Sequence, residues 1–216
     1  MVTTTENGFA FAERELHATL KADAGTIARE HALPDGYTSE IGPSACAWTR
    51  ELAQRLTRGA ALLIDYGFAA HEYYHPQRAT GTLKAHYRHH ALDDPFFWPG
   101  LADLTAHVDF SAIAIAAQDA GLNVDGYTTQ AQFLINCGIT QLLEREGAPD
   151  THGKASDASG TSRSTSGASS YLAQSNQVQR LLSPAEMGEL FKVLAVSKGL
   201  NDELLGFVNG NRVHKL

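Results

Sequence analysis

The stretch that most constrains the fold is Gly59-Ala-Ala-Leu-Leu-Ile-Asp-Tyr-Gly67. The unbroken apolar run Ala60–Ile64, bounded by glycines, is typical of a strand buried on both faces. The helical pattern of Ser44–Arg58 leads directly into it, which favours an αβ unit and a sheet that is parallel at this point. Asp65 and Tyr66 then end the run. Because ligands of open α/β sheets bind at the carboxyl ends of strands, this acid and this phenol are candidates for a site.

Composition excludes several classes of protein. The net charge of −7 over 216 residues argues against a nucleic-acid partner, because phosphate-binding surfaces need basic residues in excess. Cys46 and Cys137 are too few for a disulfide framework, so we expect a cytoplasmic protein. No apolar run approaches the ~20 residues of a membrane span, and we expect no membrane insertion.

The rest of the chain alternates between expected helices and strands. The aromatic stretch Phe68–Thr80 is expected to be a loop, and the Ser- and Gly-rich tract 151–170 a flexible one. Ser183–Glu186 resembles a capping box and predicts a helix that carries Met187, Leu190, Phe191 and Leu194 on one face. The remaining expected elements are a strand in Phe9–Leu16, a helix over Lys21–His31, a strand over Gly81–His90, a helix over Ser111–Ala120, a strand over Val124–Phe133 and a helix over Cys137–Glu146.

Polar side chains near the strand ends are the candidates for chemistry. His86 and His90 share one face if Gly81–His90 is a single strand, but no helical metal motif or Cys partner accompanies them, so we expect no metal site. Asp65 either accepts hydrogen bonds from its own turn or faces a ligand. Asp109 suits the N-cap of the following helix, whereas Asp103 and His107 have no comparable structural duty.

Several ordered motifs together resemble one family, the MidA-like family of S-adenosylmethionine-dependent methyltransferases. The resemblance covers about Tyr37–Glu146 and resumes near Leu181. The motifs that carry it are Leu63–Gly67, Gly81–Leu83, Tyr87–His90, Asp94-Pro95, Gly100, Asp103–Phe110, Thr129-Gln130, Phe133-Leu134, Gly138-Ile139 and Met187–Leu194.

The resemblance implies an α/β fold of the class I, Rossmann-like methyltransferase type, with a mostly parallel sheet and flanking helices. It implies that residues 1–150 are the C-terminal part of the methyltransferase domain and that 171–216 form a closing helical segment of the same domain. The family's glycine-rich cofactor loop has no counterpart here, because the chain contains no G-x-G. S-adenosylmethionine is therefore expected to bind mainly to residues outside this chain, and whether the chain is active alone stays open.

A protein acceptor is also implied, since a mitochondrial relative methylates an arginine of a respiratory complex subunit. A guanidinium acceptor needs carboxylates to orient it and a base to take its proton. The carboxylates available are Asp65, Asp103 and Asp109, and the bases are His90 and His107. Tyr66 would bond the acceptor or the cofactor. Expected partners are the missing N-terminal half or a second copy. The alternative function is a non-catalytic binding or assembly module that uses Tyr73–Arg78.

Overall fold

The computed structural model describes residues 1–6, 8–88, 90–147 and 175–216, and the tract 151–170 lies outside them. The chain divides into two compact units that alternate along the sequence. Unit 1 comprises 1–49 and 67–113, and unit 2 comprises 50–66 and 114–216. Helix α2 (Pro43–Arg55), strand β3 (Gly59–Phe68) and helix α4 (Phe110–Asp119) therefore each contribute residues to both units.

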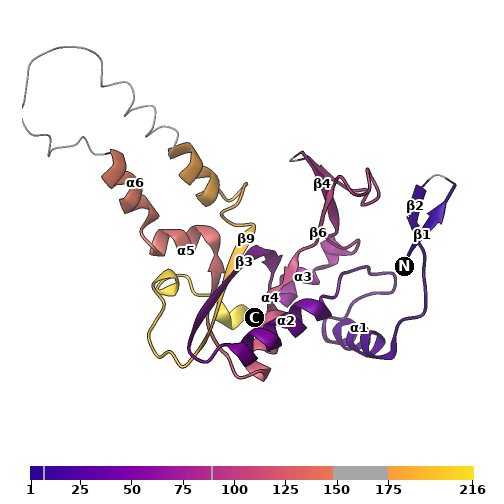
Figure 1. Ribbon diagram of the computed structural model, residues 1–216, viewed down its shortest axis with the longest axis horizontal. Helices are drawn as coiled ribbons and strands as arrows, with labels where there is room; N and C mark the ends of the chain where they lie inside the picture. The colour runs from indigo at the N-terminus through magenta and orange to yellow at the C-terminus, as the bar shows by residue number, and fades with distance from the viewer. Residues whose placement is uncertain (7, 89, 148–174) are drawn as a thin grey trace, which may run out of the picture. The chain divides into compact units, whose positions relative to one another are not determined.

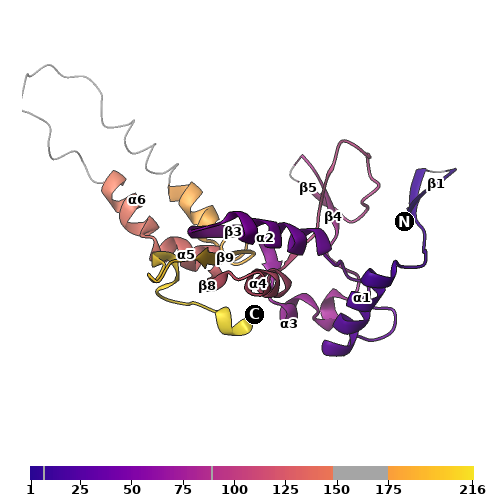
Figure 2. The ribbon, with the colours of Figure 1, turned by 60° about the horizontal axis from the view of Figure 1, so that its bottom comes forward.

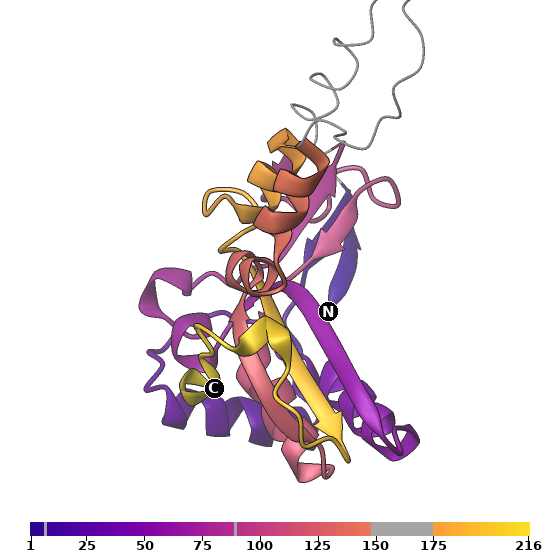
Figure 3. The ribbon, with the colours of Figure 1, turned by 90° about the vertical axis from the view of Figure 1, so that its left-hand side faces the viewer.

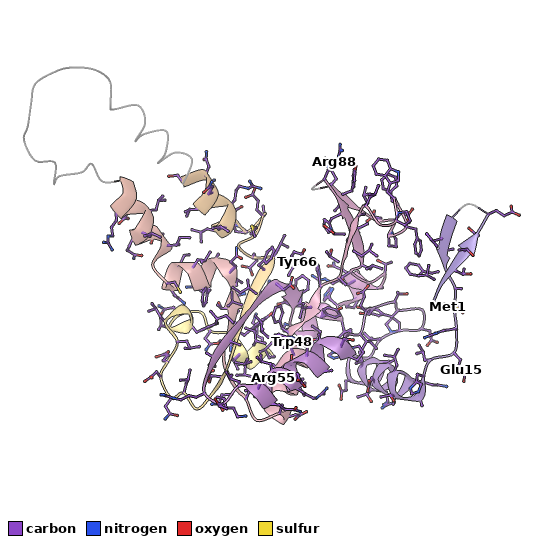
Figure 4. The ribbon with its side chains drawn as sticks, in the orientation of Figure 1. Met1, Glu15, Trp48, Arg55, Tyr66 and Arg88 are labelled. Atoms are coloured by element: carbon purple, nitrogen blue, oxygen red, sulfur yellow. The ribbon has the colours of Figure 1, made fainter. Side chains whose placement is uncertain are left out.

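Unit 1 begins with a hairpin and a helix (Figure 1). Strand β1 (Val2–Thr5) pairs antiparallel with β2 (Gly8–Phe11), and α1 (Ala18–Glu30) follows. The helix confirms the expectation from the sequence. The strand expected in Phe9–Leu16 is β2, which ends at Phe11 and pairs with the Thr-rich start of the chain. On α2 the side chain of Trp48 is 56% exposed (Figure 4).

The expected aromatic loop is not a loop. It holds helix α3 (Ala70–Tyr73) and the 3-10 turn η1 (Pro76–Arg78). Tyr73 and Tyr74 are 2% and 5% exposed, because their rings pack edge to face within unit 1. Both tyrosines are therefore core residues, and the prediction that this stretch presents them to a partner is wrong.

A three-stranded antiparallel sheet follows, with the order β5-β4-β6. Its strands are β4 (Lys84–Tyr87), β5 (His90–Leu92) and β6 (Asp103–Thr105), and Figure 2 labels β4 and β5. The single strand expected over Gly81–His90 is thus two strands. Arg88 lies in the turn with φ of 48°, a left-handed conformation that ends β4.

The end of β3 lies in unit 1 and pairs in parallel with β7 (Val108–Asp109). Gly67 makes this pairing possible, since a Cβ there would lie 2.1 Å from the Val108 carbonyl oxygen. Helix α4 starts directly after β7, as the sequence predicted within one residue. Helix packing buries Phe110, Ala114 and Ala117 along it.

Unit 2 is built on three strands in the order β3-β9-β8, which Figure 3 shows side by side. Strand β9 (Phe191–Lys198) lies between β3 and β8 (Asn123–Thr129) and runs antiparallel to both. The α/β class is confirmed, and the described sheet is mixed rather than mostly parallel. The expectation of a parallel partner for Ala60–Ile64 is wrong, because the strand beside it is the last one in the sequence.

Strand β3 is also not buried on both faces. Leu62 and Ile64 are 47% and 49% exposed, whereas Val193–Val196 of β9 are fully buried. The core of unit 2 gathers on β9, where Val193 and Ala195 pack with Phe207, Phe133 and Leu204. The most apolar run of the chain is therefore a strand with one open face.

The helix expected from Ser183 to Leu194 is wrong. Residues 184–190 form turns and β9 starts at Phe191. Gly188 fixes the turn, because a Cβ there would lie 2.2 Å from the Leu182 carbonyl oxygen. The other elements of unit 2 are a helix over 175–182, α5 (Gln130–Asn136), α6 (Ile139–Gly147), η2 (Leu205–Phe207) and η3 (Val213–Lys215).

Candidate functional site

Asp65 and Tyr66 end the unit 2 part of β3, and Figure 4 labels Tyr66. Asp65 is exposed, and its Oδ1 accepts a hydrogen bond of 2.8 Å from the Tyr66 backbone N–H. The Tyr66 ring meets the Phe191 ring edge to face at 4.8 Å. Asp65 lies within β3 rather than in a turn, so its bond to the next backbone N–H is a local strand contact, and the other carboxylate oxygen can still accept from a ligand.

A buried lysine beside Asp65 was missed by the sequence reasoning. Lys192 of β9 is 5% exposed and lies opposite Asp65 on one side and Thr129 on the other. Its Nζ donates to the Glu189 carbonyl oxygen. Lys192 does not stand out in the sequence because the pattern around it predicts a helix. In the observed strand, Lys192 is the cross-strand neighbour of Asp65.

His107 lies in unit 1 just before β7, and its backbone is held on both sides. Its N–H donates to Thr82 Oγ1 at 3.0 Å, and its carbonyl oxygen accepts from the Tyr73 hydroxyl at 3.3 Å. The imidazole packs edge to face on Phe68 at 5.1 Å, and the Arg78 guanidinium covers that same ring at 3.9 Å. This region presents a histidine on a well-anchored backbone.

Asp109 is the N-cap of α4, as predicted. Its Oδ1 accepts from the Ala112 N–H at 3.1 Å, and its Oδ2 accepts from the Tyr74 hydroxyl at 3.2 Å. Burial raises the pKa of Asp109, and burial followed by the Asp109 charge raises the pKa of Tyr74. Both carboxylate oxygens thus have structural partners, which weakens the prediction that Asp109 orients an acceptor.

Asp103 and His90 lie on the three-stranded sheet of unit 1, at different places. Asp103 of β6 lies opposite His86 of β4, and His86 Nδ1 is 3.1 Å from Thr105 Oγ1. His90 is exposed on β5, opposite Tyr87. The prediction that His86 and His90 share one strand face is wrong, because the chain turns between them. Within the described ranges, no three His, Cys, Asp or Glu side chains gather to hold a metal ion.

Unit 1 therefore brings His107 and Asp109 onto one segment beside the buried tyrosines, with Asp103 one strand earlier. Asp65 and Tyr66 belong to unit 2. A further acid, Glu40, was also missed, although its carboxylate holds the residues that anchor His107. An isolated acid before Gly42-Pro43 carries no recognisable signal in the sequence.

The residues present do not fit the whole of S-adenosylmethionine. The chain has no G-x-G turn to approach a nucleoside, and β3 has no described neighbour along Gly59–Tyr66 on the side away from β9. The described residues offer side chains at one strand edge but no enclosed donor site.

Comparison with known proteins identifies the family. The model of the family described as "Putative S-adenosyl-L-methionine-dependent methyltransferase" matches residues 1–128. The mitochondrial protein arginine methyltransferase NDUFAF7 of Mus musculus is 40% identical over 116 residues, and the Caenorhabditis elegans homolog is 34% identical over 110. These alignments cover 51% and 50% of this chain, and 24% of each relative.

A solved structure covers the whole chain. It is a "likely methyl transferase" from Burkholderia thailandensis bound to S-adenosyl-homocysteine, with 44% identity and a TM-score of 0.84. The match covers 100% of this chain and 51% of that one, so the chain spans about half the length of the solved relative and about a quarter of the curated ones. On the family match, the agreement of fold and the motifs at β3, β4 and β7, the chain belongs to the MidA-like family of S-adenosylmethionine-dependent methyltransferases.

Proposed function

We propose that this chain is the acceptor-side portion of an S-adenosylmethionine-dependent methyltransferase that acts on a protein, with an arginine side chain as the methyl acceptor. The observation that carries the proposal is the open edge of β3 in a chain that belongs to this family. The relatives named as protein arginine methyltransferases support the choice of acceptor.

The open edge supports a continuation of the sheet. Residues Gly59–Tyr66 pair with β9 along one side, and no other described strand pairs with them. An unpaired edge strand with apolar side chains is a site for pairing with another strand. Covering the exposed halves of Leu62 and Ile64 would contribute about 1 kcal/mol each. We propose that the remaining half of a longer methyltransferase covers this edge, with a second copy of the chain as the alternative.

The acceptor chemistry follows from the side chains present. When bound, S-adenosylmethionine supplies the methyl group, and the acceptor nitrogen must lose a proton as its new bond to carbon forms. A guanidinium has no lone pair to spare, so carboxylates must orient it. Asp65 and Asp103 are exposed and suit that duty better than the capped Asp109. We assign the proton-accepting role to His107, with His90 as the alternative, and acceptor bonding to Tyr66.

The proposed setting is a cytoplasmic one, which the small number of cysteines, two in 216 residues, supports. The curated relatives are instead named as mitochondrial. We also propose a subunit of a respiratory complex as the protein substrate. Within the described residues, no helix is both long and apolar enough to cross a membrane.

A non-catalytic binding module is the second candidate. Its predicted surface at Tyr73 is lost to the core, but another aromatic surface exists in unit 1. Phe97 and Trp98 stack at 4.9 Å and are 40% and 50% exposed, and Tyr87 meets Trp98 edge to face. Exposed aromatic side chains of this kind often anchor protein partners.

Calorimetry with S-adenosylmethionine tests the proposal. The samples are the chain alone, the chain co-expressed with the half of the Burkholderia protein that it does not match, and that protein's own two halves as the positive control. We expect binding by the two paired samples and none by the chain alone. Binding of S-adenosylmethionine by the chain alone would contradict the proposal that the cofactor site lies mainly outside this chain, but it would still support a methyltransferase. Assembly without any binding would favour the non-catalytic module.

Whether the open face of β3 is covered on assembly is tested with matched substitutions. Ile64→Lys places a charge on the open face of β3, and Ile135→Lys places one on an α5 position that is 45% exposed. We expect Ile64→Lys to abolish co-purification of the two halves and Ile135→Lys to leave it intact. Equal assembly by both variants would show that the open face of β3 is not covered when the two halves join.

A further inference from the structure

Glu40 occupies a carboxylate site built by the backbone of unit 1. Both of its oxygens accept from the Thr82 N–H at 3.0 Å, and Oε1 also accepts from the Leu83 N–H at 3.0 Å. The Thr82 hydroxyl donates to Oε2 at 2.9 Å. Consecutive backbone N–H groups that converge on one carboxylate form an anion-binding concavity, and hydrogen bonds to a charged acceptor are the stronger kind.

The absence of a side chain at residue 81 leaves the space that the Glu40 carboxylate occupies. Gly81 has φ of 80°, and a Cβ on it would lie 2.5 Å from Glu40 Oε1. Residue 81 is therefore a glycine for two reasons: the left-handed backbone and the space that the carboxylate fills. This loop is shaped around the Glu40 side chain rather than merely touching it.

Two hydrogen-bond paths run from Glu40 to the backbone of His107. In the first, Thr82 Oγ1 donates to Glu40 and accepts from the His107 N–H at 3.0 Å. The second involves the main chain of Glu40 rather than its carboxylate: the single hydroxyl proton of Tyr73 is shared between the Glu40 carbonyl oxygen at 3.4 Å and the His107 carbonyl oxygen at 3.3 Å. Burial and then the Glu40 charge raise the pKa of Tyr73 to about 12, so its hydroxyl stays a donor at neutral pH.

The Glu40 carboxylate thus holds the hydroxyl that fixes the His107 N–H, while the His107 carbonyl accepts from Tyr73 independently of that carboxylate. The N–H is tied through Thr82 and the carbonyl through Tyr73. The imidazole then packs on Phe68 at 5.1 Å. A shift of the Thr82 hydroxyl would move the peptide that carries the imidazole, whereas the α4 cap at Asp109 depends on none of these bonds.

We propose that Glu40 is a positioning residue, whose carboxylate sets the place of the His107 imidazole through the Thr82 hydroxyl without touching a reacting group. The catalytic consequence rests on the proposed function, in which His107 takes the acceptor's proton. The positioning itself does not, because it is a property of unit 1 that can be measured in the chain alone.

The test follows the His107 imidazole by NMR in the full chain, with its carbon-bound ring proton assigned by the loss of that signal in His107→Gln. Glu40→Gln keeps the size of the side chain but turns an amide donor towards the N–H groups of Thr82 and Leu83. Glu51→Gln is the matched control, because Glu51 is exposed and, among the described residues, forms an ion pair only with its helix neighbour Arg55. We expect Glu40→Gln to displace the His107 signal and its titration midpoint, and Glu51→Gln to leave both unchanged.

A second pair of variants keeps the test decisive if Glu40→Gln does not fold. Thr82→Val removes the hydroxyl of the first path, and Thr82→Ser retains it. We expect the valine variant to displace the His107 signal and the serine variant to restore it. An unmoved signal in Thr82→Val, or in a folded Glu40→Gln, overturns the proposal.

Activity of the assembled enzyme separates this proposal from the proposed function. Displacing a catalytic group by a fraction of an ångström to one ångström costs roughly 10- to 100-fold in kcat, and we expect that loss in Glu40→Gln with little change in KM. A displaced His107 signal with unchanged kcat would leave the positioning intact and remove His107 from the chemistry. Unchanged NMR signals with reduced kcat would instead overturn the positioning role.

Discussion

Replacing Asp109 tests how much of unit 1 depends on one buried carboxylate. Asp109→Ala removes the N-cap acceptor of α4, a loss of about 1 kcal/mol. It also leaves the hydroxyl of Tyr74, a residue that is 5% exposed, without its carboxylate acceptor, which costs about 1–3 kcal/mol. Together we expect the free energy of unfolding to fall by about 2–4 kcal/mol.

Asp109→Asn is the matched control, because asparagine caps a helix as well as aspartate does and its side-chain oxygen still accepts a hydrogen bond. We expect it to lie within about 1 kcal/mol of the native chain at neutral pH. The assay is urea unfolding followed by tryptophan fluorescence. Both tryptophans of the chain, Trp48 and Trp98, belong to unit 1, so the signal reports the unit in question.

The pH dependence of the same variant has a definite sign. Burial raises the pKa of Asp109 above the usual 3.8, so the folded state holds this proton more tightly than the unfolded state. The contribution of Asp109 to stability is therefore fully present below pH 3.8 and is lost as the pH rises through the raised pKa. Asp109→Asn should gain stability relative to the native chain over that rise. An Asp109→Ala variant as stable as the native chain, or an asparagine variant with the opposite trend, would refute this account of the cap.

Three other substitutions give expected outcomes. Gly67→Ala should lower the free energy of unfolding by more than about 3 kcal/mol in the same urea assay, because the new methyl group meets the Val108 backbone; a stable variant would contradict the close pairing of β3 with β7. His107→Ala should reduce methyl transfer by the assembled enzyme by about 100-fold or more, and unchanged turnover would remove it from the site. Asp65→Ala should raise the KM for the protein acceptor without unfolding unit 2, as circular dichroism would show, and an unchanged KM would leave Asp65 with its local strand contact alone.

Local signals in the sequence predicted the elements that depend on local physics. Helix α4 follows from its Asp109 cap, which supplies the acceptor that the helix needs, and the expected helix over Lys21–His31 agrees with α1 to within three residues. The position of β3 was equally clear, because a short apolar run between glycines has few alternatives. Asp65 and Tyr66 were found by that reasoning, but β3 continues to Phe68, so both residues lie within the strand rather than beyond its end.

Elements that depend on distant residues were not predictable. The pattern of Phe191–Val196 is compatible with a helix or a strand, and the run forms a strand because β3 and β8 pair with it on either side. The capping-box pattern before it was misleading, since Gly188 places a tight turn there. Lys192 could not be recognised as a residue of the strand edge until that assignment was corrected.

The candidate site shows the same division. Glu40 and Thr82 are separated by more than forty residues, and only the folded chain brings the carboxylate to that N–H pair. The exposed face of β3 was hidden for a different reason, because an apolar run predicts burial whether the covering partner is present or not. The aromatic stretch Phe68–Thr80 was predicted to be a loop because α3 and η1 are too short to give a periodic signal in the sequence.

The most direct test of the central claim is amide hydrogen exchange along Gly59–Tyr66. In the chain alone, alternate amides of β3 donate to β9 and should be protected, and the others face the open edge and should exchange rapidly. After assembly with the complementary half of the Burkholderia protein, the account predicts that these rapidly exchanging amides become protected. An assembled, cofactor-binding pair in which the same amides still exchange rapidly would contradict it.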